Sequence, residues 1–266
     1  MIKLKLYCVT NKRLESLERL PSNYKLVGVG DSIFPKKYII PNNLDNIYYK
    51  EKYYSELTFH YWFWKNILDK KDKNWIGFCQ KRRFWLNNET FNTNISYKNY
   101  QNFILKKPSN KWNGYDSIIC EPIFVNKVKK IKIIKRGFRS LLKDPSIFFL
   151  ENKQSIKFHF DMHHGYCTLD KAINLLDKSD REEFRFFVNN QTYFNPHIMF
   201  ISSNKIADEW FKSLFAWLHK CEDIFGFSDL IGYDKKRLYA FLGERYLSFW
   251  FNKYTKSLSW PWALIN

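Results

Sequence analysis

Three positively charged side chains follow one another directly after the short apolar run WIGFC, residues 75–79. The segment continues Gln80, Lys81, Arg82 and Arg83. Three adjacent cations cannot all be buried without partners, so they must reach solvent, acidic groups or a bound anion. Arginine forks match phosphate oxygens, and fixed cations stabilise the charge that builds on a leaving group. The sequence leaves two interpretations equally open, a clamp for a diphosphate and an ordinary charged loop.

Histidines are concentrated in a second segment, residues 158–164 (FHFDMHH), although the whole chain has only 6. In a strand, His159, Asp161 and His163 would alternate onto one face. That face could form a metal site or a general base with its partner. A single strand rarely supplies the geometry of three metal ligands, so a metal site is the weaker interpretation. We expect one of Asp161, His163 and His164 to face a ligand and the others to be structural.

A charged pair, Glu244 and Arg245, interrupts the apolar run AFLGERYLSFWF of residues 240–251. Charges inside an apolar helix are costly unless they are paired. The pair is either a structural ion pair that locks this helix to the sheet, or it includes a glutamate that orients substrate hydroxyls or a catalytic group. The sequence favours the structural interpretation.

The elements that would position these residues follow an α/β pattern. Alternating apolar and polar residues predict strands over residues 2–9 and 24–29, with a short helix over residues 12–20 between them. Such a β-α-β start favours a parallel sheet, whose ligands collect at the carboxyl ends of the strands. Thr10 and Asn11 follow the first strand at such an end.

Apolar spacing predicts the later elements: strands over 74–79 and 115–120, and helices over 54–68, 206–225 and from Asp234 onward. Ser55 or a nearby residue is expected to cap the first of these helices. Ser203 and Gly226 are expected to bound the second. No composition break divides the chain, so we expect one domain over residues 1–266.

The composition excludes several classes of protein. The chain has 266 residues, 45% hydrophobic and 20% aromatic, which is too apolar for intrinsic disorder. No run approaches the roughly 18 apolar residues of a membrane span, and the start lacks the features of a signal peptide. The 5 cysteines are widely spaced, so we expect buried thiols of a reducing compartment.

The net charge of +18 first suggests a nucleic-acid or anionic-membrane binder. However, lysine greatly outnumbers arginine, whereas directed recognition of phosphate or guanine favours arginine. Most of the excess is therefore interpreted as a solvated surface. Residues 106–157 are the exception, because 13 Lys+Arg against 4 acids give a local balance of +9. This stretch is either an ordinary strand or short helix with a basic face, or a surface for an anionic substrate or membrane headgroups.

Five short motifs occur in a fixed order. They are residues 45–66 (DNIYYKEKYYSELTFHYWFWKN), 76–84 (IGFCQKRRF), 115–119 (YDSII), 196–201 (PHIMFI) and 242–250 (LGERYLSFW). Their order and content resemble the signatures of the bacterial domain-of-unknown-function family 4422, among them N-I-S-x-K-N-x-x-Y-C-E-L-T, I-G-L-C-H-Y-R-R-F and E-R-L-L. The resemblance runs from about residue 3 to residue 252, and the shared order makes it specific.

The resemblance implies an α/β fold of the GT-A glycosyltransferase type, a Rossmann-type sandwich with a central, mostly parallel sheet flanked by helices. It implies a hexosyltransferase that moves a sugar from a nucleotide-sugar donor onto a glycan acceptor in capsule, exopolysaccharide or lipopolysaccharide biosynthesis. Galactofuranose is one donor sugar that the resemblance suggests. In GT-A folds the diphosphate site usually carries an Asp-x-Asp that holds a metal, and this sequence has none.

The resemblance puts residues 80–83 at that position, so we expect cationic side chains, with no divalent metal or other cofactor, to stabilise the departing diphosphate. The family's His-Tyr before the Arg pair is Gln80-Lys81 here, and the Asn of its N-M-F-I motif is Ile198. If that histidine is catalytic, then Asp161, His163 or His164 must supply the base that deprotonates the acceptor hydroxyl.

These arguments assign expected roles to thirteen residues. The expected donor-binding residues are Thr10 and Asn11 near the nucleotide base, Gln80, Lys81, Arg82 and Arg83 at the diphosphate, and Glu56 beside the sugar or Arg83. The expected catalytic residues are Asp161 with His163, and Glu244. The expected acceptor-side or supporting residues are His164, His197 and Arg245.

The expected partners are a nucleotide sugar, a glycan or lipid-linked acceptor, and the anionic inner membrane at its cytoplasmic surface, but not nucleic acid. The alternative from another class is a basic nucleic-acid or membrane-surface binding protein without catalysis. That protein would bind any polyanion with strong salt dependence and without preference for nucleotide sugars.

Overall fold

The computed structural model describes residues 3–87 and 95–265 of the chain. It divides into two compact units, and each is described by itself. Unit 1 comprises residues 1–121, 197–213 and 250–266, and unit 2 comprises residues 122–196 and 214–249. Both units are discontinuous along the chain, and the single domain over residues 1–266 stays a prediction.

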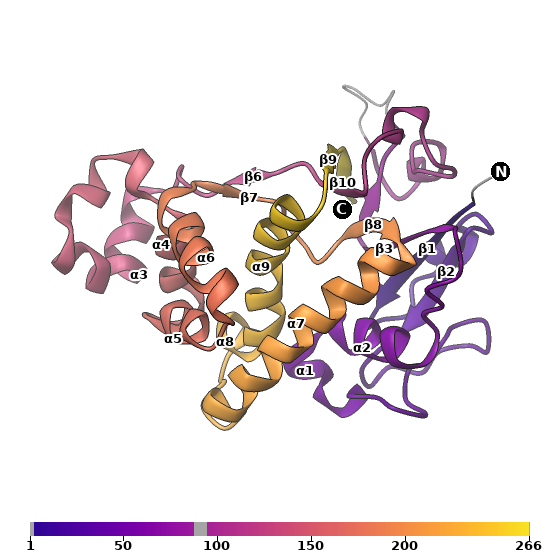
Figure 1. Ribbon diagram of the computed structural model, residues 1–266, viewed down its shortest axis with the longest axis horizontal. Coiled ribbons are helices and arrows are strands. Elements are labelled where there is room, and N and C mark those ends of the chain that lie inside the picture. Colours follow the sequence, from indigo (N-terminus) through magenta and orange to yellow (C-terminus); the bar gives the residue numbers. More distant parts are fainter. Residues whose placement is uncertain (1–2, 88–94, 266) are drawn as a thin grey trace. The chain divides into compact units, whose positions relative to one another are not determined.

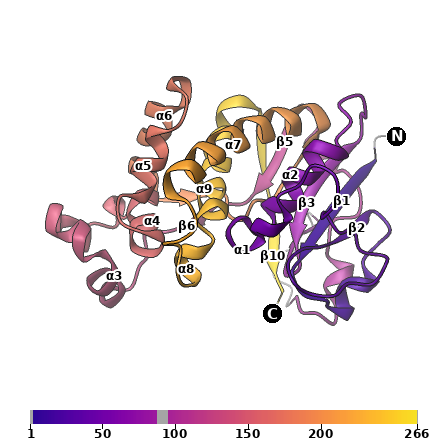
Figure 2. The same ribbon diagram turned by 90° about the horizontal axis from the view of Figure 1, so that it is seen from below.

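Unit 1 is built around a mixed sheet whose central strands begin the chain. β1 (Leu4–Thr10) pairs in parallel with β2 (Tyr24–Gly28) on one side and with β3 (Trp75–Gln80) on the other. Figures 1 and 2 show these three strands side by side. The predicted parallel start is therefore confirmed, although the predicted helix over 12–20 is only a 3-10 turn, Glu15–Arg19.

The sheet continues through strands from the second half of the chain. β8 (Phe200–Ser203) runs antiparallel between β3 and β5 (Ser117–Cys120), and β9 (Ser257–Trp260) pairs in parallel with β5. The order is therefore β2-β1-β3-β8-β5-β9. Two short antiparallel strands, β4 (Arg83–Trp85) and β10 (Trp262–Leu264), extend the sheet beside the end of β3. The predicted central, mostly parallel sheet is confirmed.

Aromatic side chains fill the space between this sheet and its helices. Tyr7 and Phe78 share a register position on β1 and β3 and pack against Phe59 and Phe63 of α2 (Leu57–Asn66), with ring centroids 4.9–6.2 Å apart. Phe211 of α7 (Asn204–Phe225) meets the same ring of Phe78. The opposite face of the sheet has its own core, in which Cys8 and Cys79 are neighbours.

The predicted helix over residues 54–68 is two helices. α1 (Glu51–Tyr54) ends at Ser55, whose positive φ of 50° breaks the helix before α2 begins. Ser55 offers its carbonyl oxygen to the hydroxyl of Thr58 (2.8 Å), and no side chain caps α2. The predicted serine cap is therefore wrong, because Ser55 is used as the turn between the two helices.

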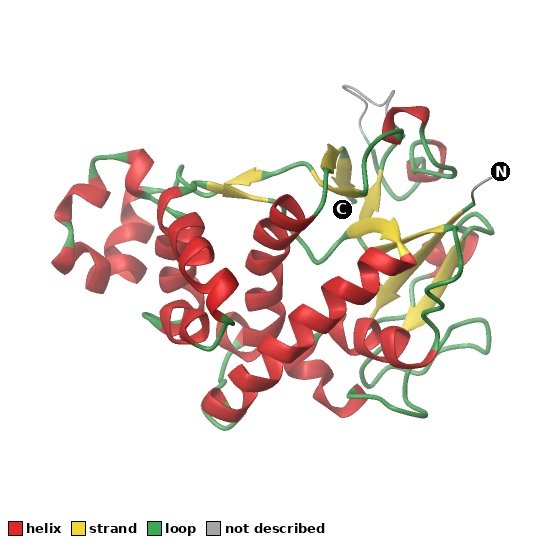
Figure 3. Ribbon diagram, viewed as in Figure 1, coloured by secondary structure: helices red, strands yellow, loops and turns green. Residues whose placement is uncertain are grey.

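Unit 2 is mainly helical, as Figure 3 shows. Its helices are α3 (Lys130–Lys143), α4 (Ile156–His164), α5 (Thr168–Asn174), α6 (Lys178–Asn190), α8 (Tyr233–Lys236) and the parts of α7 and α9 (Leu238–Tyr254) that belong to it. Its two short strands, β6 (Ile123–Phe124) and β7 (Tyr193–Phe194), pair antiparallel. In the described part of the chain, the remaining 3-10 turns are Tyr48–Lys50, Tyr100–Asn102, Asn110–Trp112, Pro145–Phe148 and Glu151–Lys153.

The strand interpretation of residues 158–164 is wrong, because this segment lies in α4. The Ser155 hydroxyl accepts from the Phe158 amide (3.3 Å) at the start of this helix, and Gly165 ends it with a φ of 118°. The prediction for residues 206–225 is confirmed, with Gly226 (φ 55°) at its end. The last predicted helix is interrupted at Arg237, so Asp234 lies in α8 and does not cap α9.

Candidate functional site

The thirteen residues singled out from the sequence form two groups, one in each unit. Unit 1 holds Thr10, Asn11, Glu56, Gln80, Lys81, Arg82, Arg83 and His197. Unit 2 holds Asp161, His163, His164, Glu244 and Arg245. The two groups are described separately.

The residues of unit 1 gather where β1 and β3 end. Gln80, the last residue of β3, lies opposite Val9 of β1, and the Lys81 amide donates to the Val9 carbonyl oxygen (3.0 Å). The ammonium group of Lys81 then reaches Asn11, whose side-chain oxygen accepts its hydrogen bond at 2.5 Å. The residues that follow β1 and β3 therefore lie together at the carboxyl edge of the sheet.

Thr10 and Asn11 shape the turn after β1. The Thr10 hydroxyl donates to the Lys12 carbonyl oxygen (2.5 Å) and accepts from the Lys12 amide (3.1 Å), while its side chain is buried. The Asn11 carbonyl oxygen accepts from the Ser32 hydroxyl (2.8 Å), which ties the loop after β2 to this turn. These bonds hold the Asn11 side chain beside Lys81.

A continuous network of side-chain hydrogen bonds runs through Arg83. The Gln80 amide group donates to the Glu56 carboxylate, and the Gln80 side-chain oxygen accepts from Arg83 Nη1 (2.9 Å). Arg83 Nε donates to His197 Nε2 (3.0 Å). Because arginine has no acceptor, His197 Nε2 must be the unprotonated ring nitrogen, which places the proton of the neutral imidazole on Nδ1.

The hydrogen bonds from Gln80 and His197 hold the Arg83 guanidinium group on two sides and fix its plane. The expected neighbourhood of Glu56 and Arg83 is realised through Gln80, which lies between them and bonds to both. His197 has a positive φ of 61° and packs edge-on against Trp262, with ring centroids 4.6 Å apart. Within the described residues, Arg83 Nη2 makes no hydrogen bond, so it is the atom through which a bound anion would be held.

Arg82 has partners of a different kind. Its Nε donates to the Ile265 carbonyl oxygen (3.2 Å), and the Ile265 amide donates to the Arg82 carbonyl oxygen (2.7 Å). Its side chain is exposed. These bonds join Arg82 to Ile265, whereas the bonds of Lys81 and Arg83 run to Asn11, Gln80 and His197.

His60 is a core histidine. It lies four residues after Glu56, but its ring is 1% exposed and packs against Phe78 and Phe211, with centroids 4.4 and 5.6 Å away. Burial lowers the pKa of His60 to about 3, so the ring is neutral near pH 7. Within the described residues, no cluster of three or more His, Cys, Asp or Glu side chains has the arrangement of a metal site.

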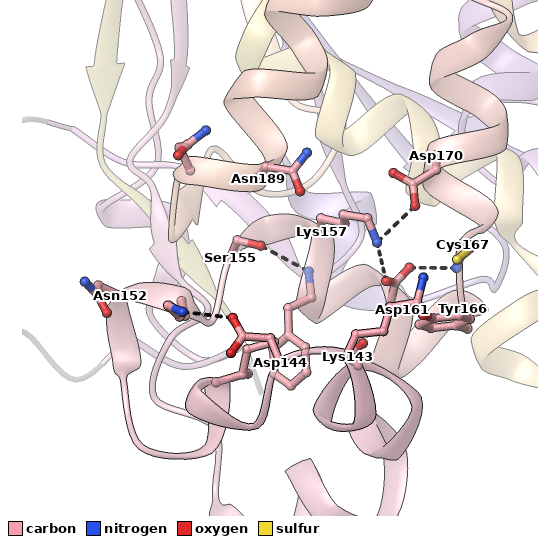
Figure 4. A pocket seen from close by; sticks show the side chains of 15 residues that line it. Lys143, Asp144, Asn152, Ser155, Lys157, Asp161, Tyr166, Cys167, Asp170 and Asn189 are labelled. Atoms are coloured by element: carbon pink, nitrogen blue, oxygen red, sulfur yellow. Dashed lines mark hydrogen bonds and ion pairs between the residues drawn. The ribbon is translucent and has the colours of Figure 1, made fainter.

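In unit 2, Asp161 lines a pocket of about 580 Å³ between α3, α4, α5 and α6. Figure 4 shows Lys157 between Asp161 and Asp170. The Lys157 ammonium group lies 2.5 Å from Asp161 Oδ2 and 3.0 Å from Asp170 Oδ2, and the Cys167 amide donates to Asp161 Oδ1 (3.0 Å). Burial raises the pKa of Asp161 and outweighs the lowering by Lys157 and by the Cys167 amide.

Most of the other residues that line this pocket are polar, and Ile147, Phe158 and Tyr166 are the apolar and aromatic ones among them. The Tyr166 ring lies 5.5 Å from the Lys143 ammonium group and 5.9 Å from that of Lys157. Ser140, Asn152, Asn189 and Asn190 add hydroxyl and amide groups to the lining. A wall of this kind offers many hydrogen-bonding groups to a polyhydroxylated ligand.

His163 lies on another face of α4. Its Nδ1 is 2.9 Å from Arg136 Nη1, which also bonds to Asp234 (3.0 Å), and the ring borders a separate hollow of about 340 Å³. Residues two apart on a helix point about 200° from each other, so Asp161 and His163 do not meet. The predicted shared face was a consequence of the strand interpretation and is wrong with it.

Arg245 is a buried cation at the centre of unit 2. It is 2% exposed and donates to the adjacent Glu244 carboxylate. Its Nη2 approaches His159 Nδ1 (3.4 Å) and His164 Nε2 (3.5 Å), and its guanidinium group lies 4.5 Å from the Phe194 ring. The ion pair on α9 therefore contacts α4, and the expected link of this helix to the sheet stays a prediction.

This buried charge keeps its histidine neighbours neutral. Burial first, and then the positive charge of Arg245, lower the pKa of His159 to about 2 and the pKa of His164 to about 3. Burial and Arg136 also lower the pKa of His163. His164 is held further by Asp234, whose carbonyl oxygen lies 2.7 Å from Nδ1, and by stacking on Phe241.

Sequence reasoning missed Lys157, Tyr166 and Asp170. Lys157 and Asp161 have the i, i+4 spacing of a helical ion pair, a signal that can be read only if residues 156–164 are taken as a helix. Tyr166 and Asp170 come from the following turn and from α5, and only the packing of α4 and α5 brings them to the pocket.

Comparisons with known proteins agree with this architecture. The model of a family described as a domain of unknown function, DUF4422, matches residues 5–256. No curated protein matches the chain. A solved structure titled as the apo form of WbbM, a bifunctional glycosyltransferase, is similar with a TM-score of 0.69 and 18% identity. The match covers 99% of this chain but 45% of that one, so the chain spans less than half of that protein, and the likeness is one of fold.

Proposed function

This chain belongs to the DUF4422 family, and from that premise we propose that it is a glycosyltransferase. The proposed reaction transfers a hexosyl unit from a nucleotide-sugar donor to a glycan acceptor of a surface polysaccharide, with galactofuranose among the candidate sugars. The fold of unit 1 supports the proposal, because its sheet resembles that of a solved glycosyltransferase and carries polar residues at the carboxyl ends of its parallel strands.

The single observation that carries the proposal is the pair Lys81 and Arg83 at those strand ends. Asn11 positions the lysine, and Gln80 and His197 hold the arginine. Two oriented cations beside the ends of parallel strands suit the diphosphate of a nucleotide sugar. Arg82, which is exposed, is proposed to join them when the donor binds.

In the proposed reaction an acceptor hydroxyl attacks the anomeric carbon of the donor sugar. The bond from that carbon to the diphosphate oxygen breaks, and the nucleoside diphosphate leaves with the electron pair. Lys81 and Arg83 stabilise the negative charge on the departing oxygens, which is the task of the metal in enzymes that carry an Asp-x-Asp. We assign Thr10 and Asn11 to the nucleotide side and Glu56, through Gln80, to the orientation of Arg83.

We assign the pocket around Asp161 to the acceptor. Its polar wall and the Tyr166 ring suit a saccharide, and Asp161 is the lining residue that we propose as a base. His163 has no part in that step, because it lies on another face of α4. Glu244 and Arg245 of α9 contact α4 through its residues His159 and His164, and we assign Glu244, Arg245 and His164 a positioning role.

We propose that the enzyme works in the cytoplasm, where nucleotide sugars are made. All five cysteines are free thiols, and four of them are buried, as suits a reducing compartment. No helix within residues 3–87 and 95–265 is long and apolar enough to cross a bilayer.

A thermal-shift screen tests the proposal. Uridine-, guanosine- and thymidine-diphosphate sugars are each added at about 100 times a trial Kd, which stabilises a binding protein by about 2.7 kcal/mol. For a chain of this size we expect a melting temperature raised by roughly 5–10 °C with one nucleotide class. The double variant Arg82→Ala, Arg83→Ala should lose the shift, and an Arg19→Ala variant, which removes one exposed charge elsewhere in unit 1, should keep it.

The screen also separates the rival function. A polyanion-binding protein would bind DNA with strong salt dependence and show no shift with any nucleotide sugar. That result would overturn the proposal. Turnover that needs manganese and stops with a chelator would instead overturn only the replacement of the metal by Lys81 and Arg83.

A further inference from the structure

Helix α3 lies at the edge of unit 2 (Figure 1). It exposes a stripe of large apolar side chains. These four residues, named here the α3 stripe, are Ile131, Ile134, Phe138 and Leu142, and they are 52–69% exposed. Fully exposed positions on a helix are normally polar, and scattered single apolar residues need no explanation. Four exposed apolar residues on one helix, at spacings of three, four and four residues, do need an explanation.

The stripe is a second apolar face, distinct from the one that packs. Ile133 and Gly137 face inward and are buried, with Phe158 and Met162 of α4 against them. At about 100° per residue, the stripe covers an arc of about 80° that adjoins this inner face. The apolar half of α3 is therefore wider than the surface that α4 covers, and the uncovered part faces solvent.

Positive charges flank the stripe on its other side. Residues 127–143 contain eight Lys and Arg residues and no acidic residue. In helical projection Lys132, Lys135, Arg136, Arg139 and Lys143 fall in an arc of about 100° next to the stripe. Arg136 bonds to Asp234, and Lys143 lies over Tyr166, while Lys132 and Lys135 extend from exposed positions.

We propose that α3 is a membrane-docking helix that lies in the plane of an anionic bilayer surface. An apolar stripe bounded by a basic face is the pattern of helices that bury their apolar side about 5–10 Å into the headgroup boundary. The stripe supplies apolar area to the acyl boundary. The adjoining cations face the phosphate groups, and each contributes about a five-fold gain in affinity at an anionic surface.

The chemistry of the stripe selects lipid over other anionic partners. A nucleic acid would engage the cations but leave four large apolar side chains in water. A second copy of this basic chain would bring like charges together, which opposes association. An anionic bilayer satisfies both faces of the helix at once, because it offers negative charge and an apolar interior a few ångströms apart.

The inference stands without the glycosyltransferase proposal, but the two fit together. Ser140 and Lys143 of the same helix line the pocket around Asp161. An α3 that lies on the bilayer would hold this pocket close to the headgroups. If the acceptor is lipid-linked, as the proposed function allows, its saccharide would have a short path from the membrane to the pocket.

Co-sedimentation of the full chain with vesicles tests the proposal. The vesicles contain phosphatidylcholine with roughly one third phosphatidylglycerol, and pure phosphatidylcholine vesicles serve as the neutral comparison. The stripe variant replaces all four stripe residues by Gln, which keeps helix propensity. The charge variant is Lys132→Gln, Lys135→Gln and Arg139→Gln. We expect each to weaken binding to the anionic vesicles at least roughly 30-fold.

Two matched controls change the same chemistry elsewhere in unit 2. One removes three exposed lysines, Lys171→Gln, Lys178→Gln and Lys235→Gln, and the other removes exposed apolar side chains, Ile224→Gln and Ile231→Gln. Both should bind like the wild type. Circular dichroism and melting of each variant confirm that it is folded, as expected for substitutions at exposed positions.

Several results would overturn the proposal. They are no binding by the wild type, equal binding to neutral vesicles, or unchanged binding by the stripe variant. A wild type that elutes as a dimer, together with a monomeric stripe variant that still binds vesicles, would assign the stripe to a second copy instead. Nucleotide-sugar shifts recorded on the same variants keep this test independent of the enzymatic proposal.

Discussion

Replacing Glu244 by Gln should destabilise unit 2 strongly, because it leaves the buried Arg245 without its counter-charge. The Arg245 side chain is 3% exposed and that of Glu244 15%. The histidine neighbours of Arg245, His159 and His164, are neutral, because burial and Arg245 itself lower their pKa values to about 2 and about 3. Neither ring can therefore supply the negative charge that Glu244 provides.

The magnitude follows from the burial of the pair. Breaking a buried ion pair by removing one partner costs about 3–5 kcal/mol. The partial exposure of Glu244 and the contact of the guanidinium group with the Phe194 ring, which is worth about 1–2 kcal/mol, place the expected loss near 3 kcal/mol. For a chain of this size, such a loss lowers the melting temperature by roughly 6–12 °C.

Differential scanning calorimetry measures this loss, since it resolves the two units if they melt separately. Arg245→Met combined with Glu244→Gln should cost clearly less than the sum of the single changes, because it removes both charges together. Glu209→Gln, an exposed glutamate on α7, is the control and should change stability by less than about 0.5 kcal/mol. If Glu244→Gln melts like this control, the structural account of the pair is refuted and the catalytic interpretation of Glu244 gains support.

Two further predictions concern the titration of buried groups. The pKa values of His159 and His164 in the folded protein lie below those in the unfolded chain, so unfolding takes up protons in acid. The free energy of unfolding should therefore be constant above about pH 6.5. Below that pH it should fall by up to about 1.4 kcal/mol per pH unit for each ring. Urea unfolding from pH 7.5 to pH 5 measures this, and a flat profile would contradict the buried neutral rings. Lys157→Met leaves the Asp161 carboxylate without its cation, so the melting temperature relative to wild type should fall more at pH 8 than at pH 5, where protonation relieves the charge. An equal loss at both values would mean that Lys157 acts by packing alone.

The strand ends of unit 1 could be read from the sequence because local pattern and fold agree there. β1 and β3 are alternating or apolar runs with polar residues directly after them, and parallel pairing brings such ends together. The sequence could not show which of the three cations has partners at the strand ends and which has a partner elsewhere. Lys81 and Arg83 have partners at the strand ends, while Arg82 bonds to residue 265, which is remote in the sequence.

The error at residues 158–164 has a specific cause. Ile156, Phe158, Phe160 and Met162 are apolar at every second position, the period of a strand. They lie in a helix because α4 is buried on more than one side: Phe158 and Met162 pack toward α3, while Phe160 lies near Arg245 of α9. All four are buried, so the helix has no polar stripe to reveal its period of 3.6.

The most direct test of the central claim is a calorimetric titration of a nucleoside diphosphate into the wild type and the Arg83→Ala variant. If Lys81 and Arg83 bind the diphosphate, the wild type binds it and the variant binds it about 10- to 150-fold more weakly, which is the worth of charge-assisted hydrogen bonds from one arginine. The parent nucleoside, which lacks phosphates, should bind far more weakly to both. Equal affinity of the two proteins for the diphosphate, or no binding by the wild type, would contradict the diphosphate site at the end of β3.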